Sequence, residues 1–452
     1  MKKITCITFM MLLVCSTYAQ KRNWEWVFGH YNRVSFASGA PVASFCGIDT
    51  NEGSASICDT SGKFLFYTDG IFAYDSTGAY MLNGSGLFGS YISAQSALIV
   101  PAPSNTQQYY LFTLSNWTDI STKFAYSIVD MSLNNGMGAV SSVKNVILNS
   151  NAREQLTAVP HANGQDVWIM VHEANNTNFC VYLLSANGID TVPIVSPVGM
   201  MYSGNNRYGT MRFSHNCTKL VSNLGGDSPN ETVQLFDFDN ATGIVSNPVT
   251  LGTTADMTDA YYSEFSPDDS KLYLTAYNNF YIYQFDLNAT NIPSSIIDVA
   301  NTATSSCSSL QLAPDGKIYI QHQVSSMAAI NNPNNAGIAC NYVDNALFLP
   351  GTPGLCLPNF YNYDCGSTTS IAENQLVKLV TVYPNPFRDE LSIEADNEDG
   401  EIFIYDIASR KLLQMKFVNS VKLNTEQLAK GIYFYELRNR SGVVKKGKVV
   451  RN

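Results

Sequence analysis

The sequence has little charge: only 14% of its 452 residues are Asp, Glu, Lys or Arg. It holds 5 histidines, and none of its cysteines forms a Cys-x-x-Cys pair. Because structural zinc sites usually need such pairs, we predict no bound metal, and no cofactor motif is present. The hydrophobic share of 45% and the aromatic share of 12% exclude a disordered chain, since they supply enough side chains for a core.

Familiar catalytic motifs are missing as well. Glu173 follows His172, but Asn176 stands where a His-Glu-x-x-His zinc protease has its second histidine. No Gly-x-Ser-x-Gly segment marks the nucleophile of a serine hydrolase. The net charge of −10 disfavours nucleic acid and anionic membranes as partners. We therefore predict no catalytic residues and expect a protein that is not an enzyme.

Only one long apolar run occurs, at the N-terminus. Residues 4–14 follow the basic start Lys2-Lys3 and precede Thr17-Tyr18-Ala19, where small residues suit a signal peptidase. We predict a signal peptide at residues 1–19 and an exported mature chain. The run is too short to span a bilayer, and no later run is long enough, so we expect no transmembrane segment in the mature chain.

Export also permits disulfides, and the mature chain keeps eight cysteines. These are Cys46, Cys58, Cys180, Cys217, Cys307, Cys340, Cys356 and Cys365. The nearest neighbours, Cys46–Cys58 and Cys356–Cys365, are the first candidate pairs, which leaves Cys180–Cys217 and Cys307–Cys340. The sequence does not fix the pairing, and isolated buried thiols are the alternative.

What the chain does have is a repeated β-hairpin. At residues 265–274, Ser-Pro-Asp-Asp separates two β-rich runs, and this is the chemistry of a tight turn. Related units lie at residues 57–66, 100–112, 159–170, 213–220 and 312–320. Their spacing of roughly 40–60 residues is typical of propeller blades, since one small sheet cannot bury both of its faces alone.

Two segments remain outside the six hairpins, residues 24–44 and residues 355–361. If they paired, they would complete a seventh blade from both ends of the chain and leave no open seam. The sequence thus predicts an all-β fold with a β-propeller at residues 20–365. Seven blades are favoured, and six are the alternative.

The propeller region also resembles a known family. Asn51-Glu52-Gly53, Tyr67-Thr68-Asp69-Gly70, residues 95–101 and residues 355–360 match, in order, motifs of secreted WD-repeat-like propellers from gliding and surface-attached Bacteroidetes. The resemblance covers residues 24–363. It implies a propeller fold and an exported protein, but no reaction.

Polar residues on the predicted inner strands are candidate ligand contacts at one mouth of the channel. We single out Glu52, Asp69, Gln95 and Arg212. The alternative is that they bond backbone groups and neighbouring blades, as buried polar groups normally do. A polysaccharide hydrolase or lyase would require a pair of carboxylates at the mouth of the channel, and Glu52 with Asp69 is the first candidate pair.

The amino-acid composition of the chain changes after a Gly-Ser-Thr linker at residues 366–375. Residues 376–452 are richer in charge and hold no cysteine. Alternating apolar residues predict strands at 391–394, 402–406, 411–413, 423–428 and 431–437. These strands would form a small immunoglobulin-like β-sandwich.

This second region resembles the type A C-terminal sorting domain of the type IX secretion system. The residues that carry the resemblance are Pro384, Asn385, Pro386, Gly431, Tyr433, Lys446 and Lys448. It implies that the type IX machinery is a partner. It also implies passage through the periplasm to the outer-membrane surface or the medium.

A rigid ring without a catalytic constellation indicates a secreted or cell-surface binding or adhesion module. Its ligand would be an unknown surface glycan or protein. The alternatives are a propeller hydrolase or lyase and a structural component of the surface or gliding apparatus, because one fold hosts many functions.

Overall fold

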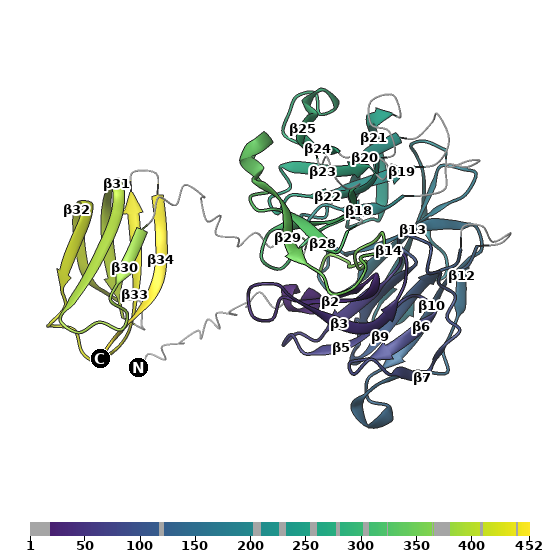
Figure 1. The fold of residues 1–452 in the computed structure, drawn as a ribbon, viewed down its shortest axis with the longest axis horizontal. Coiled ribbons are helices and arrows are strands. Elements are labelled where there is room, and N and C mark those ends of the chain that lie inside the picture. Colours follow the sequence, from purple (N-terminus) through teal and green to yellow (C-terminus); the bar gives the residue numbers. More distant parts are fainter. Residues whose placement is uncertain are drawn as a thin grey trace, which may run out of the picture. The chain divides into compact units, whose positions relative to one another are not determined.

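The structure is a computed structural model, and it describes residues 19–116, 122–201, 209–225, 232–253, 260–276, 281–301, 307–322, 324–363, 365, 380–406, 410–439 and 442–452 (Figure 1). The predicted signal peptide, apart from Ala19, and the predicted linker lie outside these residues. The chain divides into two compact units, Met1–Gly366 and Ser367–Asn452.

The larger unit is a β-propeller of seven blades, as predicted. Blade one holds β1 (Glu25–Phe28), β2 (His30–Ser35) and β3 (Val42–Asp49). Blade two holds β4 (Ala55–Cys58), β5 (Phe64–Thr68), β6 (Phe72–Asp75) and β7 (Tyr80–Ser85). Blade three holds β8 (Ala97–Ala102), β9 (Asn105–Leu114), β10 (Phe124–Asp130), β11 (Ala139–Val140) and β12 (Val146–Asn149). A short parallel pairing of β7 with β11 joins the second and third blades.

The remaining four blades follow in chain order. Blade four holds β13 (Ala152–Pro160), β14 (Val167–Glu173), β15 (Asn178–Ser185), β16 (Gly188–Ile189) and β17 (Ile194–Pro197). Blade five holds β18 (Met211–Phe213), β19 (Lys219–Leu224), β20 (Thr232–Asp239) and β21 (Ile244–Thr253). Blade six holds β22 (Ala260–Phe265), β23 (Lys271–Ala276), β24 (Tyr281–Asp286) and β25 (Ile297–Asn301). Blade seven holds β26 (Cys307–Leu312), β27 (Ile318–His322), β28 (Ser326–Ile330) and β29 (Tyr342–Phe348). Short 3₁₀ turns lie at Ala19–Asn23, Asn134–Gly136, Pro293–Ser295 and Gly337–Cys340.

Burial decreases from the channel outward. Every residue of β4 is buried, whereas nearly all of β3 and β29 is at least partly exposed. The core is a series of apolar layers between neighbouring blades, because each sheet needs a partner for both faces. Between the first and last blades, Trp26 and Phe28 pack against Tyr319 and Met327. This layer closes the ring, and Figure 1 shows the purple β2 and β3 beside the green β28 and β29.

The predicted source of the seventh blade is wrong. Blade one takes all three of its strands from the N-terminal segment, and residues 355–361 form no strand. Among the described residues, the only β-bridge between the two ends of the propeller is the one where His30 N donates to Thr352 O at 2.9 Å. The Asn32 side chain adds hydrogen bonds to Thr352 O and from Gly351 N. Pro353 and Pro358 lack a backbone N–H, so this stretch is a poor strand for a ladder.

Residues 351–363, the channel segment, instead cross the channel. Leu355 N donates to Asn51 O at 2.7 Å, and Asn359 N donates to Ser54 O at 2.8 Å. The Asn359 side chain donates to Ala97 O at 3.1 Å and to Leu156 O at 2.9 Å. One asparagine therefore bonds the inner strands of blades two, three and four.

A disulfide joins Cys217 to Cys365, immediately after the channel segment, with the two Cα atoms 5.0 Å apart. The four predicted pairings are therefore wrong, since Cys46, Cys58, Cys180, Cys340 and Cys356 are free. Cys46 lies on the outermost strand of blade one and Cys58 on the innermost strand of blade two, so closeness in sequence does not bring them together. Free buried thiols, the alternative reading, describe four of these five residues.

The smaller unit is one five-stranded sheet that folds over its own core. Its strands are β30 (Val380–Tyr383), β31 (Glu390–Tyr405), β32 (Lys411–Asn424), β33 (Gly431–Asn439) and β34 (Gly442–Arg451). The first half of β31 pairs with β30 and the second half with β33, with an irregularity between Glu394 and Asp399. The two layers of the predicted sandwich thus share β31 and β32, and their core includes Phe387, Leu391 and Tyr433.

The bonds of Asn359 predict a large effect of one substitution. Asn359→Ala leaves two buried carbonyls without their donor, and we expect the full mature chain to lose about 2–4 kcal/mol of unfolding free energy. Urea unfolding followed by tryptophan fluorescence measures the change. Asn187→Ala, in an exposed turn, is the matched control and should change stability by less than about 0.5 kcal/mol. Equal stability of the two variants would show that the channel segment does not hold the ring together.

Candidate functional site

Seven inner strands surround the channel, and each begins at the same mouth and ends at the other. The strands are β1, β4, β8, β13, β18, β22 and β26, and from β1 to β26 each contacts the next. Glu52, Ser93, Glu154 and Tyr261 lie where inner strands begin, and we call this group the acidic mouth. Arg212, His215, Glu264 and Gln311 lie toward the strand ends, and we call this group the arginine mouth.

Glu154 is the most deeply buried acid of the acidic mouth, with 1% of the residue exposed. Its Oε1 accepts a hydrogen bond from Tyr261 Oη at 2.9 Å and one from Gly209 N at 3.2 Å. Its Oε2 and Glu52 Oε2 have no hydrogen-bond partner of good geometry. Ser93 and the Ala94 backbone nevertheless lie close enough to the Glu154 carboxyl to lower its pKa. The two carboxyl groups are close enough for the charge of Glu154 to act on Glu52.

Burial acts on the pKa of both acids in the same direction. Burial raises the pKa of Glu154 to about 7, and the interactions with Tyr261, Gly209, the Ala94 backbone and the Ser93 side chain only partly oppose it. Burial, and then the nearby Glu154 charge, raises the pKa of Glu52 well above 4.5. Near neutral pH this pair holds a proton that an exposed glutamate would have lost.

The expected pairing of Glu52 with Asp69 is not formed. Asp69 Oδ1 accepts from Ile71 N at 2.8 Å and Phe72 N at 2.6 Å, and Oδ2 accepts from Tyr74 Oη at 3.0 Å. Both oxygens thus serve the turn between β5 and β6. The sequence interpretation missed Glu154, although Arg153-Glu154-Gln155 is a conspicuous polar run at the start of an otherwise apolar strand.

Gln95 also has a structural role. Its Oε1 accepts from Met211 N at 2.8 Å, and its Nε2 donates to Met211 O at 2.9 Å. The same amide group lies 3.4 Å from Asn359 Oδ1. Gln95 thereby joins blade five to the channel segment, as the alternative reading of the inner polar residues proposed.

Arg212 is held rigidly at the arginine mouth. Its guanidinium donates to Gln311 Oε1 at 2.9 Å and lies 3.4 Å from Glu264 Oε2. Glu264 also accepts from Leu312 N at 2.9 Å and Phe265 N at 3.0 Å. In contrast to Glu154, this buried acid has a cation beside it. Arg212 Nε, however, is buried without a hydrogen-bond partner.

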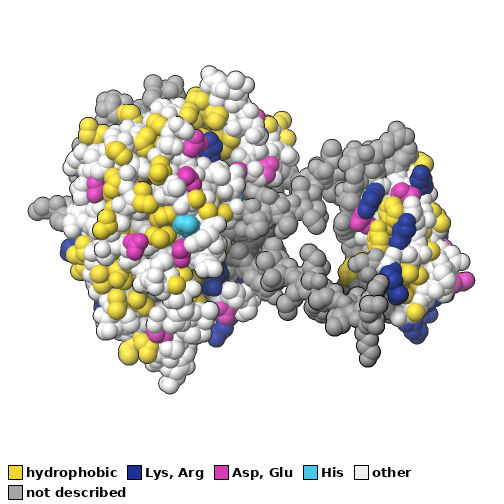
Figure 2. All heavy atoms as spheres, turned by 180° about the vertical axis from the view of Figure 1, so that it is seen from behind, with side chains coloured by type: hydrophobic (Ala, Val, Ile, Leu, Met, Phe, Trp, Pro, Cys, Tyr) yellow, Lys and Arg dark blue, Asp and Glu magenta, His cyan; other side chains and the backbone are white. Residues whose placement is uncertain are grey.

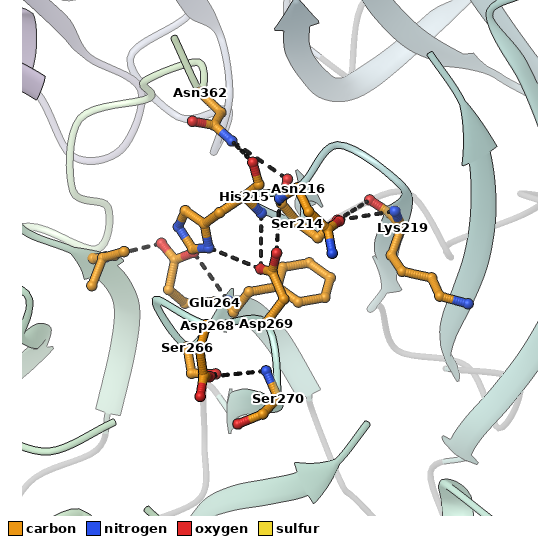
Figure 3. A network of polar contacts seen from close by, with 12 residues as sticks. Ser214, His215, Asn216, Lys219, Glu264, Ser266, Asp268, Asp269, Ser270 and Asn362 are labelled. Atoms are coloured by element: carbon orange, nitrogen blue, oxygen red, sulfur yellow. Dashed lines mark hydrogen bonds and ion pairs between the residues drawn. The ribbon is translucent and has the colours of Figure 1, made fainter. Parts of the chain in front are cut away.

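His215 lies beside this ion pair, in the turn of blade five (Figure 3). Asp269, from the Ser-Pro-Asp-Asp turn of blade six, accepts from His215 N at 2.8 Å and Asn216 N at 2.8 Å. His215 Nδ1 lies 3.0 Å from the same carboxylate. Burial works against the charged imidazole, but the Asp269 bond and the Glu264 charge outweigh it and raise the pKa of His215. The repeated turn therefore joins one blade to the next.

A cavity of about 130 Å³ opens at the arginine mouth. Arg212, His215, Glu264, Gln311, Asn23 and Asn362 supply polar groups to its wall. Asn23 Oδ1, like Arg212 Nε, is buried without a partner. Two residues of the cavity wall thus hold an unpaired polar atom, one a donor and one an acceptor.

The sorting-motif residues come together at one edge of the smaller unit. Asn385 Oδ1 accepts from Val450 N at 2.9 Å, and Phe387 N donates to Val450 O at 2.8 Å. Gly431 has a φ of +154°, which an L side chain rarely adopts, and it opens β33. Tyr433 Oη donates to Ala429 O at 2.6 Å. Pro384 and Pro386 flank Asn385, while Lys446 and Lys448 lie on β34 opposite Glu436 and Phe434.

The surface of the two units differs in character. On the face that Figure 2 shows, the propeller has scattered charges among uncharged and apolar side chains, whereas Lys and Arg are frequent on the smaller unit. Within the described parts of the chain, no helix has the length and apolar character of a membrane span. The same residues include no group of three or more His, Cys, Asp or Glu side chains arranged to hold a metal.

The raised pKa of Glu154 predicts a pH dependence. A folded-state pKa of about 7 against an ordinary 4.5 means that the carboxyl favours folding below pH 4.5 and that this contribution is lost as the pH rises through 7. Glutamine does not ionise, so Glu154→Gln does not lose this stability as the pH rises. The variant should therefore gain stability over the wild type between pH 5 and pH 8, by up to about 3 kcal/mol.

Urea unfolding of both proteins in metal-free buffer at each pH measures this difference. Glu173→Gln is the control, because three asparagine amides bond that carboxyl and its pKa is lowered rather than raised. A constant difference between Glu154→Gln and the wild type across this range would contradict the assignment.

Solved structures similar to the chain are distant. One is PorZ, a surface component of the type IX secretion system of Porphyromonas gingivalis, with 12% identity, a TM-score of 0.34, and coverage of 96% of this chain and 75% of that one. A protein of unknown function from Desulfotomaculum acetoxidans has 11% identity, a TM-score of 0.43, and coverage of 74% and 98%. A periplasmic gluconolactonase of Pseudomonas aeruginosa has 10% identity, a TM-score of 0.37, and coverage of 76% and 97%. Scores this low support no functional comparison.

No curated protein sequence matches the chain. The smaller unit, in contrast, matches a family model: residues 381–451 fit the Secretion system C-terminal sorting domain. This region includes the strands and motif residues described above. The match identifies the C-terminal unit as a sorting domain of the type IX secretion system, which exports the chain to the cell surface or the medium.

Proposed function

We propose that the exported propeller is a binding module that holds a hydroxyl-bearing sugar unit of a surface glycan at the arginine mouth. One observation carries the proposal: two residues that line the cavity, Arg212 and Asn23, each hold a buried polar atom without a hydrogen-bond partner, the donor Nε of Arg212 and the acceptor Oδ1 of Asn23. Buried polar groups are normally bonded, so an unpaired donor and acceptor in one cavity favour a ligand that supplies both. A hydroxyl group donates and accepts at once.

Size and rigidity support the same ligand. A cavity of 130 Å³ is comparable to one that holds a benzene molecule, about 150 Å³, so it suits one sugar ring rather than an oligosaccharide. Gln311 and Glu264 fix the guanidinium of Arg212, which lowers the entropy lost on binding. The ligand would be a terminal or branching unit that enters from the mouth.

A glycan array probed with the full mature chain tests the proposal. We expect a ligand, and we expect Arg212→Lys to weaken its binding about tenfold or more, because lysine keeps the charge beside Glu264 but lacks the Nε donor. Calorimetric titration measures the dissociation constants. Arg33→Lys is the matched control, since Arg33 pairs with Glu25 in blade one, away from the cavity. Unchanged affinity of Arg212→Lys would place the binding site elsewhere.

A second function, cleavage of a polysaccharide, is favoured by the acidic mouth. A carboxyl with a pKa of about 7 is suited to act as a general acid near neutral pH, and Glu52 is the second carboxyl beside it. Release of reducing ends from a bound polysaccharide by the wild type, together with its loss in Glu154→Gln, would favour hydrolysis over binding alone.

The sorting domain predicts the fate of a truncated chain. A chain that ends at Cys365 keeps the channel segment and the disulfide, so we expect a folded propeller that accumulates in the periplasm. Fractionation of the native bacterium into periplasm, outer membrane and medium measures this. Grafting residues 367–452 onto an unrelated periplasmic protein is the converse control and should export it. Arrival of the truncated chain outside the cell would show that the propeller contains an export signal of its own.

A further inference from the structure

The acidic mouth contains more unpaired oxygen atoms than its hydrogen bonds explain. Glu52 Oε2 and Glu154 Oε2 are buried without a hydrogen-bond partner. Ser93 is fully buried beside the Glu154 carboxyl, and its Oγ has no well-formed hydrogen bond either. An unpaired polar atom this deep in a protein usually marks a site for water, an ion or a ligand.

These oxygens come from three places that one loop brings together. The loop at residues 91–96 leads into β8, and Glu52 N donates to Tyr91 O at 3.0 Å. Gly53 packs so closely on this loop that a Cβ atom there would lie 2.6 Å from Ser93 O. Glu154 faces the same loop from blade four, beside Ser93 and Ala94. Glu52 and Glu154 thus flank residues 93 and 94 from two sides.

The charge of this group is not balanced by protein atoms. Among the described residues, no ion pair includes Glu52 or Glu154. Glu264, the corresponding buried glutamate at the other mouth, has Arg212 beside it. A bound proton would neutralise only one of the two carboxyl groups and leave the other buried and charged, which is costly. A divalent cation would neutralise both.

We propose that Glu52 and Glu154 bind a divalent metal ion at the acidic mouth, with Ser93 supplying a neutral oxygen ligand. All three ligands are hard oxygen donors, which favour Ca²⁺ or Mg²⁺ over zinc or copper. Two carboxylates suffice when hydroxyls, backbone carbonyls and water complete the shell, as calcium allows. The ion would join blade two, the loop before blade three, and blade four.

Binding of Ca²⁺ by the full mature chain, after treatment with chelator, tests the proposal. We expect one ion per chain by equilibrium dialysis and a rise of the melting temperature by about 3 °C or more at saturation, because a ligand of the folded state stabilises it. Glu52→Gln and Glu154→Gln should each weaken the affinity by at least about tenfold. Glu264→Gln is the matched control and should keep the wild-type affinity.

The sign of the stability difference between Glu154→Gln and the wild type distinguishes a lost metal site from a variant that merely folds poorly. In chelator, Glu154→Gln should be at least as stable as the wild type, since it removes repulsion from Glu52. In saturating Ca²⁺ the order should reverse. Failure of the wild type to bind Ca²⁺, Mg²⁺ or Mn²⁺ would overturn the proposal, and so would a wild-type affinity in both glutamine variants. Neither result would bear on the proposal of glycan binding, which concerns the arginine mouth.

Discussion

The ring depends on how the polar groups of its channel are satisfied. Inner strands expose backbone groups toward the axis, and buried backbone groups are rarely left unpaired. Asn359 resolves this with one side chain, which bonds Ala97 O and Leu156 O while its backbone N–H bonds Ser54 O. The chain end thereby links three blades from the inside. Sheet pairing between the two ends, which contributes one bridge at His30 and Thr352, is secondary to it.

The same constraint divides the two mouths into different kinds of site. At the arginine mouth every charge has a partner: Arg212 with Glu264, and His215 with Asp269. What remains is one unpaired donor and one unpaired acceptor, which suits a neutral, hydroxyl-bearing ligand. At the acidic mouth the unpaired groups are carboxylate oxygens, which suits a cation or a proton. The chemistry of each mouth follows from what the fold leaves unpaired there.

The repeated turns allowed the propeller to be predicted from sequence, because Ser-Pro-Asp-Asp at residues 266–269 and its five relatives mark the same hairpin in six of the blades. The seventh blade was inferred from the segments left over, and only residues 24–44 belong to it. The inter-blade role of the turns was not predictable, since it needs Asp269 to reach His215 in another blade. Glu154 was missed because sequence alone does not say which strands share a mouth. Asn359 was assigned to a strand, although Pro353 and Pro358 near it argued against one. The prediction of the cysteine pairs was wrong for a related reason. Cys217 and Cys365 are 148 residues apart in the sequence, and the ring brings such distant residues close together in space.

The position of the disulfide bears on export. Cys365 is the last described residue before the sorting unit, so any pull on that unit passes through it to the propeller. Because Cys365 is bonded to Cys217, the load reaches the β18–β19 turn of blade five directly rather than the hydrogen bonds of Asn359. Disulfides form in oxidising compartments, and the periplasm lies on the type IX route. The disulfide would thus tie the end of the channel segment to blade five before the sorting domain is engaged.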